Sequence, residues 1–431
     1  MKTALLLTAL CFPIAAQADI SHWLKPMTEI DTGDTAWVSL STILVLFMTI
    51  PGLALFYGGM VRKKNVLATM IQSFATACLV GVIWVVVGYS LAFTPNSPFI
   101  GGFDRLFLHG LDLYHDQALV TIYPGAPTIP EPIFMLFQMA FAIIAGAIIT
   151  GAFAERMKFS ALLWFVGAWS LFIYIPTAHW IWGIGGWLAS DGVLDYAGGT
   201  VIHVNAGVAG LIAAVMIGKR VGYGREAMMP HNLVLTLIGT AMLWFGWFGF
   251  NAGSALAADG RAAMALATTQ AAAISGGITW QLVEIAFKHK PSALGLASGV
   301  VAGLVGITPA AGFVTVQSAL FIGIITSAMC FITATKLKFW LGYDDSLDAF
   351  GIHGVGGIIG AILTGLFVST DISGVDTTLW TQIESVLITI FYSALGSFLI
   401  LKTIDKTIGL RVDYDDERQG LDLVLHGERI E

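Results

Sequence analysis

Eleven long apolar stretches dominate this chain of 431 residues. Each is close to the ~20 residues that a helix needs to cross the hydrocarbon core of a membrane. Lipid offers backbone N–H and C=O groups no hydrogen-bond partner, so such stretches cross it as helices. The sequence therefore predicts an all-α polytopic membrane protein with eleven transmembrane helices. The stretches are residues 36–58, 66–93, 132–154, 159–180, 199–218, 232–251, 262–286, 292–308, 314–335, 349–369 and 382–405.

The composition agrees with this interpretation. Hydrophobic residues make up 56% of the chain and charged residues only 11%, whereas soluble domains carry about 25% charged residues. The sequence has no basic nucleic-acid patch and no glycine-rich phosphate loop, so we expect no nucleic-acid partner. Its three cysteines, Cys11, Cys78 and Cys330, suit neither a disulfide framework nor a metal cluster. We expect no metal and no cofactor.

The N-terminus has the pattern of a signal peptide. Residues 1–18, MKTALLLTALCFPIAAQA, combine Lys2, an apolar run and an Ala-Gln-Ala ending. The alternative is a short first membrane helix, but the apolar run is too short to span. We therefore predict a signal peptide at 1–18, an extracytoplasmic segment at 19–35, a membrane domain at 36–407 and a cytoplasmic tail at 408–431.

Lysine and arginine alternate between the predicted loops. Seventeen of the 21 follow an odd-numbered stretch or belong to the C-terminal end, Lys2 lies in the predicted signal peptide, and only Lys25, Arg105 and Arg261 lie on the opposite side. Loops rich in Lys and Arg stay in the cytoplasm. This distribution predicts a multi-pass protein of the cell membrane, with the mature N-terminus outside and the C-terminus in the cytoplasm.

Two segments of the chain resemble each other. In VIHVNAGVAGL (201–211) and GIHGVGGIIGA (351–361), an Ile-His pair is followed by glycines four and seven residues after the histidine. The segments lie five stretches apart, so their helices must run in opposite directions. This predicts an inverted repeat of stretches 1–5 and 6–10, with the eleventh added. A chance similarity of two glycine-rich helices is the alternative.

His203 and His353 occupy equivalent places in this repeat. Inverted repeats place their site where the halves meet, so the two imidazoles should approach each other there. An ionisable group at membrane depth usually has a function, although two histidines could simply pack the halves together. Asp195 and Asp348 precede them and could cap or brace the two helix starts. The other seven histidines, including His179, are expected to be solvated or interfacial.

Several aromatic residues admit ordinary interpretations. Phe137 and Phe141 lie four residues apart on one helix face, which is typical of helix packing or lipid contact, and Phe250 allows the same interpretation. Trp182 could be a tryptophan of the membrane interface, and Ser254 could cap backbone carbonyls. No nucleophile–base pair emerges, so we do not expect an enzyme.

Seven motifs, taken in order, resemble those of the Amt/Mep/Rh family of ammonium transporters. The resemblance runs from the first stretch to the tail, although the final HGERIE departs from the usual family ending. The motifs are FYGGMVRKKN (56–65), GAFAERMKFSA (151–161), LDYAGGTVIHVNAGVAGL (194–211), GWFGFNAGS (246–254), LVGITPAAG (304–312), DAFGIHGVGG (348–357) and the pieces GLRV, GLD and HGE within 409–428.

The resemblance implies roles for the aromatic residues. Trp182, Ser254 and Phe141 match an outer vestibule that receives the ammonium ion. Phe141 and Phe250 match a stacked pair that closes the pore below the vestibule.

The resemblance also implies roles for the polar residues of the pore. His203 and His353 match twin histidines lining a hydrophobic lumen, and Asp195 matches a buried acid that supports the site. It further implies a homotrimer, transport of ammonium and possibly of methylammonium, and a PII-type signalling protein that docks at the cytoplasmic face. The tail could instead only stabilise the trimer.

Physical chemistry favours the same substrate. A bare ammonium ion in an apolar lumen loses hydration worth on the order of 20 kcal/mol, whereas neutral ammonia avoids most of that cost. We therefore predict recruitment of the ion, deprotonation at the vestibule and passage of ammonia along the histidines. The alternatives are a membrane ammonium sensor that signals through its tail, and a different small-solute channel.

Overall fold

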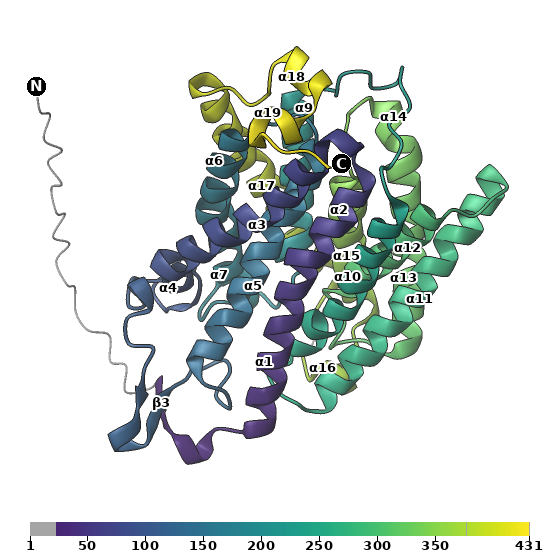
Figure 1. The fold of residues 1–431 in the computed structure, drawn as a ribbon. Coiled ribbons are helices and arrows are strands. Elements are labelled where there is room, and N and C mark those ends of the chain that lie inside the picture. Colours follow the sequence, from purple (N-terminus) through teal and green to yellow (C-terminus); the bar gives the residue numbers. More distant parts are fainter. Residues whose placement is uncertain (1–22, 376, 431) are drawn as a thin grey trace, which may run out of the picture.

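The computed structural model describes residues 23–375 and 377–430, so the predicted signal peptide lies outside the described residues. A helical segment coincides with each of the eleven predicted stretches (Figure 1). The first five segments are Thr32–Met60 (α1, Thr32–Phe47, and α2, Ala54–Met60), Lys63–Phe93 (α3, Val66–Ile83, and α4, Tyr89–Phe93), Glu131–Phe153 (α5, Glu131–Thr150), Phe159–Ser190 (α6, Phe159–Trp169, α7, Ile175–Trp182, and α8, Trp187–Ser190) and Gly199–Ile217 (η10, Gly199–Val204, and α9, Asn205–Ile217). The next three are single helices, Leu233–Gly253 (α10), Gly260–Lys288 (α11) and Ala293–Ile307 (α12). The last three are Val316–Leu341 (α13, Val316–Ile332, and α14, Lys338–Leu341), Ala349–Phe367 (η12, Ala349–Gly354, and α15, Val355–Phe367) and Leu379–Thr407 (α17).

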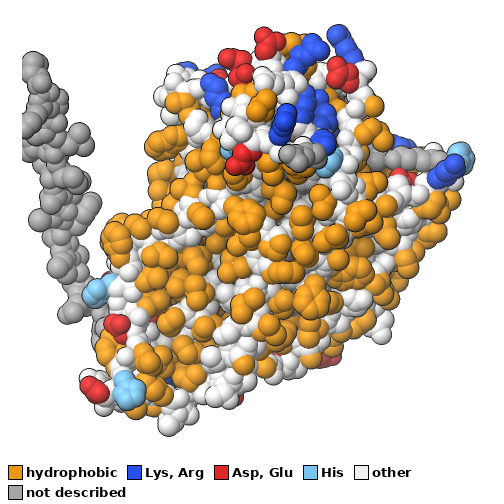
Figure 2. Space-filling model, viewed as in Figure 1, with side chains coloured by type: hydrophobic (Ala, Val, Ile, Leu, Met, Phe, Trp, Pro, Cys, Tyr) orange, Lys and Arg blue, Asp and Glu red, His pale blue; other side chains and the backbone are white. Residues whose placement is uncertain are grey.

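Length and hydropathy distinguish these segments. Within residues 23–375 and 377–430, nine are long and apolar enough to cross a membrane. The other two are α11 and α12, and α12 is an apolar helix of only 15 residues. Figure 2 shows a broad apolar band over the helices, with lysine and arginine gathered at the end that holds α18 (Tyr414–Gln419) and α19 (Leu421–His426).

Ion pairs hold together the loops at this charged end. The buried Glu155 carboxylate, after the third helical segment, accepts hydrogen bonds from Arg62, after the first, and from Arg220, after the fifth. Arg220 also pairs with Asp344, after the ninth, at 2.8 Å. Burial opposes the charge on Glu155, but Arg220 and Arg62 outweigh it and lower its pKa. The loops that follow the first, third, fifth and ninth helical segments therefore lie at the same end of the molecule.

The tail packs against the same loops. Its backbone pairs with the loop after α5, where Val412 N–H donates to the Arg156 carbonyl at 3.1 Å. Further on, Asp422 accepts from the Ala68 N–H in the first turn of α3 at 2.8 Å. The C-terminal segment is thus part of the folded unit at the charged end.

The opposite end holds a feature that the all-α prediction lacked. Three short strands form an antiparallel sheet in the order β1 (Leu24–Pro26), β3 (Leu119–Thr121), β2 (Leu113–Tyr114). These strands are too short to give a periodic signal, and they pair the N-terminal segment with the loop before α5. Nearby, Arg105 forms a buried ion pair with Glu131 at 2.9 Å.

Glycines let the two halves of the bundle touch where η10 and η12 meet. A Cβ at Gly207 would lie 2.3 Å from the Gly354 Cα, and a Cβ at Gly357 would lie 3.0 Å from the His203 Cβ. Any larger residue would push the backbones apart. The glycines that follow each histidine therefore bring the two segments into contact.

Candidate functional site

Two short segments with the same local structure begin the site. η10 and η12 are both π-helical, and each follows a residue with positive φ, Gly198 at 109° and Asp348 at 58°. Each leads into a longer α-helix, α9 or α15. The backbone N–H groups at such a start have no partner within the helix and need acceptors from elsewhere.

A buried aspartate caps each start. Asp195 accepts from four backbone N–H groups, those of residues 198 to 201, at 2.6 to 3.0 Å. Asp345 accepts from three, those of residues 349 to 351, at 2.8 to 3.2 Å. Each aspartate stands eight residues before the histidine of its segment, His203 or His353. The two caps are equivalent in spacing and in bonding.

The predicted cap at Asp348 is wrong. Its carboxylate pairs with Lys338 Nζ at 2.5 Å, and its own left-handed backbone ends the turn before η12. The carboxylate of Asp345, four residues before the segment, reaches the free N–H groups instead. The equal spacing of Asp195 and Asp345 from the histidines was a signal in the sequence that could have identified the correct residue.

The two histidines lie in contact. Their Nδ1 atoms are 3.2 Å apart, within hydrogen-bond distance, and their rings stack with centroids 5.2 Å apart and an angle of 22°. His203 is fully buried and His353 is 4% exposed. The Nε2 atom of His203 is buried and has no hydrogen-bond partner among the described residues.

The histidine pair continues into aromatic rings on α10. His203 stacks against Trp247, with centroids 5.5 Å apart, and against Phe250, at 5.9 Å. Trp247 was not among the predicted site residues, although it lies one helical turn before Phe250 and was detectable by that spacing. Its indole N–H donates to the Thr308 hydroxyl at 2.9 Å, which fixes the ring.

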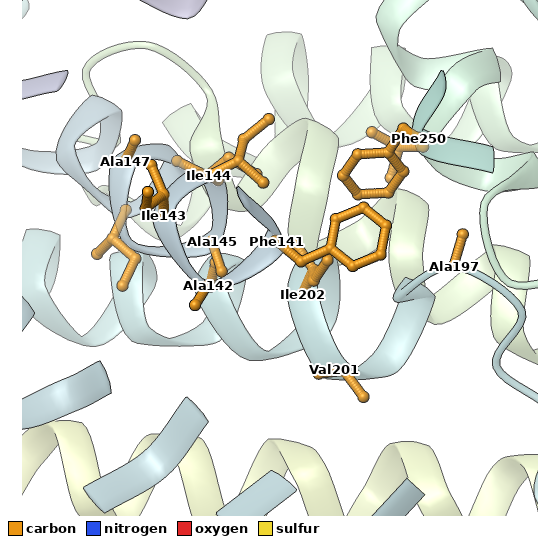
Figure 3. Close-up of a cluster of buried hydrophobic side chains, with 14 of the residues drawn as sticks. Phe141, Ala142, Ile143, Ile144, Ala145, Ala147, Ala197, Val201, Ile202 and Phe250 are labelled. Carbon is orange, nitrogen blue, oxygen red and sulfur yellow. The ribbon is translucent and has the colours of Figure 1, made fainter. Parts of the chain in front are cut away.

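Phe141 and Phe250 lie in contact next to this pair. Their ring centroids are 4.5 Å apart and both rings are buried, but the rings are tilted by 54° to each other and are not stacked as predicted. Figure 3 shows the two rings next to each other above the segment that carries Val201 and Ile202. Phe141 also contacts Trp182, at 5.9 Å. The rings therefore form a continuous row from Trp182 to the histidines.

A cavity of about 360 Å³ lies on the other side of Phe141, and its lining includes Trp182 and Ser254. The indole N–H of Trp182 donates to the Asp195 carbonyl at 2.8 Å, which ties the cavity wall to the cap of η10. The Ser254 hydroxyl donates to the Phe250 carbonyl at 2.9 Å, so its lone pairs remain able to accept. Each of the seven predicted site residues thus contacts at least one of the others.

His179 is not solvated, which removes one of the two predicted positions for this histidine, solvated or interfacial. Its side chain is fully buried, and its ring nitrogens lie 2.8 Å from the Ala92 carbonyl and 2.7 Å from the Ser97 carbonyl. The segment after α4 folds over the end of α7 and covers the ring. Hydropathy alone does not show such a cover.

Comparison with known proteins gives a consistent result. The model of the Ammonium Transporter Family matches residues 36–430. A Bacillus subtilis (strain 168) protein named ammonium transporter is 47% identical over 408 residues, which cover 92% of this chain and 98% of that protein.

Solved structures resemble the chain as well. The crystal structure of Saccharomyces cerevisiae Mep2 has a TM-score of 0.82 and 33% identity, over 90% of this chain and 89% of that one. A structure called Sensor Amt Protein has a TM-score of 0.82 and 28% identity, over 91% and 98%. Because the family model and the relatives span nearly the whole chain, this protein belongs to the ammonium transporter family and is a multi-pass membrane protein.

Proposed function

We propose that this ammonium transporter takes up the ammonium ion in the cavity lined by Trp182 and Ser254, removes a proton there and passes ammonia along His203 and His353. The contact between the two Nδ1 atoms, at 3.2 Å in a buried site, carries this proposal. Two hydrogen-bonding groups thus lie side by side in buried surroundings that also hold the rings of Trp247 and Phe250.

The cavity suits the cation. The faces of Trp182 and Phe141 attract a positive charge by roughly 0.5–2 kcal/mol, and the Ser254 oxygen accepts one of its N–H groups. Beyond Phe141 and Phe250 the surroundings are apolar and buried. A bare cation there loses its hydration, so the neutral molecule passes more easily.

The shared hydrogen bond fixes the state of the two rings. One Nδ1 donates and the other accepts, so the two Nε2 atoms present one acceptor and one donor when both rings are neutral. Such a pair binds ammonia through either its lone pair or its N–H groups. Potassium ion is excluded by this route because it has no proton to release and would have to enter the lumen as a bare cation.

The same proposal includes the membrane arrangement. Eleven helices cross the membrane, with the sheet end outside and the tail in the cytoplasm. The loops after the first, third, fifth and ninth helical segments meet at the charged end. This supports successive loops that lie on alternate sides of the membrane. The equal spacing of Asp195 and Asp345 from their histidines supports an inverted repeat. We further propose a homotrimer and a PII-type partner at the cytoplasmic face, from the family resemblance.

Ammonium sensing is the second candidate, because the structure called Sensor Amt Protein resembles the chain over 91% of its length. A sensor would bind ammonium at the same cavity and transmit the change through the tail. Flux separates the two functions, since a sensor needs binding alone.

The decisive experiment measures current and methylammonium flux together in reconstituted vesicles. His353→Ala removes half of the imidazole pair, so selective uptake should disappear while the protein still folds and inserts. His289→Ala, at an exposed histidine in the residues after α11, is the matched control and should transport normally. Uptake at the wild-type level in His353→Ala would rule out the scheme.

The other outcomes identify the alternatives. Ammonium binding without flux in the wild type would favour the sensor. Rapid swelling of the vesicles in neutral solutes would favour a different small-solute channel.

A further inference from the structure

The outer cavity, which Trp182 and Ser254 line, is far larger than the ion that it is proposed to receive. Its volume is about 360 Å³, whereas a water molecule, which is similar in size to ammonium, takes up about 30 Å³. Pockets that bind whole organic molecules have volumes of about 300–1,000 Å³. Ammonium alone therefore does not account for the size of this space.

The walls that a ligand in this cavity can reach are mostly apolar. The lining side chains that are partly exposed are Trp182, Ile184, Leu256 and Ser254. The first three also pack against the hydrophobic core, and the serine is the polar member of the set. A ligand that carries methyl groups therefore finds apolar partners here, whereas ammonium has no methyl group to place against them.

Leu256 is held over the cavity in an unusual backbone conformation. Its φ is 57°, in the left-handed region that a bulky side chain rarely adopts. The turn after α10 fixes it, because the Leu256 N–H donates to the Gly253 carbonyl at 2.9 Å. Glycine or asparagine would fit such a turn with less strain. Strain that persists at a cavity points to a function for the side chain.

The cavity also suits a positive charge. The ring of Trp182 is partly exposed to it and contacts Phe141, with centroids 5.9 Å apart. Among the described residues, no lysine or arginine lines the space. Aromatic faces attract cations, and sites with aromatic walls bind quaternary ammonium ions. Such an ion has no N–H group, so it needs no hydrogen-bond acceptor from the walls.

We propose that the outer cavity binds quaternary methylated ammonium ions, such as tetramethylammonium, and that these ions block transport. The positive charge lies against the Trp182 ring, and the methyl groups contact Ile184 and Leu256. This inference rests on the proposed function, since it requires that the transported amines enter through the same cavity.

The bound ion blocks the protein because it cannot continue inward. It has no proton to release, so it stays charged. Below the cavity lie the buried rings of Phe141 and Phe250, whose centroids are only 4.5 Å apart. The ion therefore competes with the transported amines for the cavity. Competition raises the half-saturating concentration of the substrate and leaves the maximal flux unchanged.

The test measures methylammonium uptake by intact cells that express the full-length protein, with tetramethylammonium added outside. We expect the half-saturating concentration of methylammonium to rise in proportion to the added ion, at constant maximal flux. Labelled tetramethylammonium should not enter these cells faster than cells without the protein. The uncharged tert-butanol, which has similar bulk, should not inhibit.

Two variants test the apolar walls. Leu256→Ala and Ile184→Ala remove contacts with the methyl groups, so each should weaken the block by about fivefold. The half-saturating concentration of methylammonium itself, with its single methyl group, should change less. Leu111→Ala is the matched control, at a partly exposed leucine before α5 that does not line the cavity, and it should keep the full block.

Several results would overturn the inference. Uptake that tetramethylammonium does not inhibit is the first, and it decides the matter in the wild type even where a variant fails to fold. A lowered maximal flux with an unchanged half-saturating concentration, equal inhibition by tert-butanol, or entry of the labelled ion through the protein would also contradict it. So would a full block in both wall variants, or an equal loss in the control. Wild-type cells without methylammonium uptake would instead contradict the proposed function itself.

Discussion

The Asp195 cap and the Asp345 cap use the same device in different surroundings. Both aspartates bind the free N–H groups of a π-helical start, and both stand eight residues before a histidine. Around Asp195 lie the indole of Trp182 and the wall of the aromatic cavity. Around Asp345 lie Lys338 and the Arg220–Asp344 ion pair.

The difference separates the features that the two segments share from those that belong to each end of the molecule. Both segments need a cap, because both helices start inside the protein without backbone partners. The neighbours differ because one end forms the proposed substrate cavity and the other end joins the loops and the tail. Equivalent backbone geometry therefore does not imply equivalent function.

The largest expected effect is on the Asp195 cap. Asp195→Ala leaves four buried N–H groups without an acceptor, at about 1–3 kcal/mol each. Within residues 23–375 and 377–430 its carboxylate forms no ion pair, so the loss is that of hydrogen bonds. We expect methylammonium uptake to be lost and the thermal midpoint in detergent to fall. Asp195→Asn, which keeps one oxygen acceptor, should lose less; an Asp195→Ala variant with normal uptake and midpoint would show that the cap is dispensable.

A smaller effect is expected at the Asp345 cap. Asp345→Ala frees three N–H groups instead of four, and Lys338 keeps Asp348 as its partner. The thermal midpoint should fall less than in Asp195→Ala. Asp348→Ala is the matched comparison and should cost less than Asp345→Ala. If the two substitutions cost the same, Asp345 would not be the main cap.

The smallest effect concerns acid and the ion pairs near the Asp345 cap. Arg220 and Arg62 lower the pKa of Glu155 against the opposing effect of burial. A lowered carboxyl pKa stabilises the fold above the unfolded value, about 4.3 for glutamate, and this contribution is lost as pH falls through the lower folded value. The wild type should therefore exceed Glu155→Gln in stability by the largest amount at neutral pH.

This difference should begin to shrink below about pH 4.3. Thermal unfolding in detergent across the acid range measures it. Glu226→Gln, at an exposed glutamate in the loop after α9, controls for the substitution itself. A difference between the wild type and Glu155→Gln that stays constant through the acid range would mean that the Arg220–Glu155 pair does not stabilise the charged end.

The sequence by itself determined the helices and most of the candidate site. Long apolar stretches allow only helices in lipid, so the helical segments appear where the hydropathy predicted them. The repeated Ile-His motif with its glycines indicated which residues would meet. Both signals are local in the chain, and local signals survive folding because they depend on backbone hydrogen bonding and on side-chain size.

The tertiary structure decided what depends on neighbours far apart in sequence. It selected Asp345 over Asp348, because only the folded turn shows which carboxylate reaches the free N–H groups. It covered His179 with the segment after α4, paired three short strands, and placed Trp247 against His203. Burial and hydrogen-bond satisfaction are properties of the packed chain, and hydropathy along the sequence does not contain them.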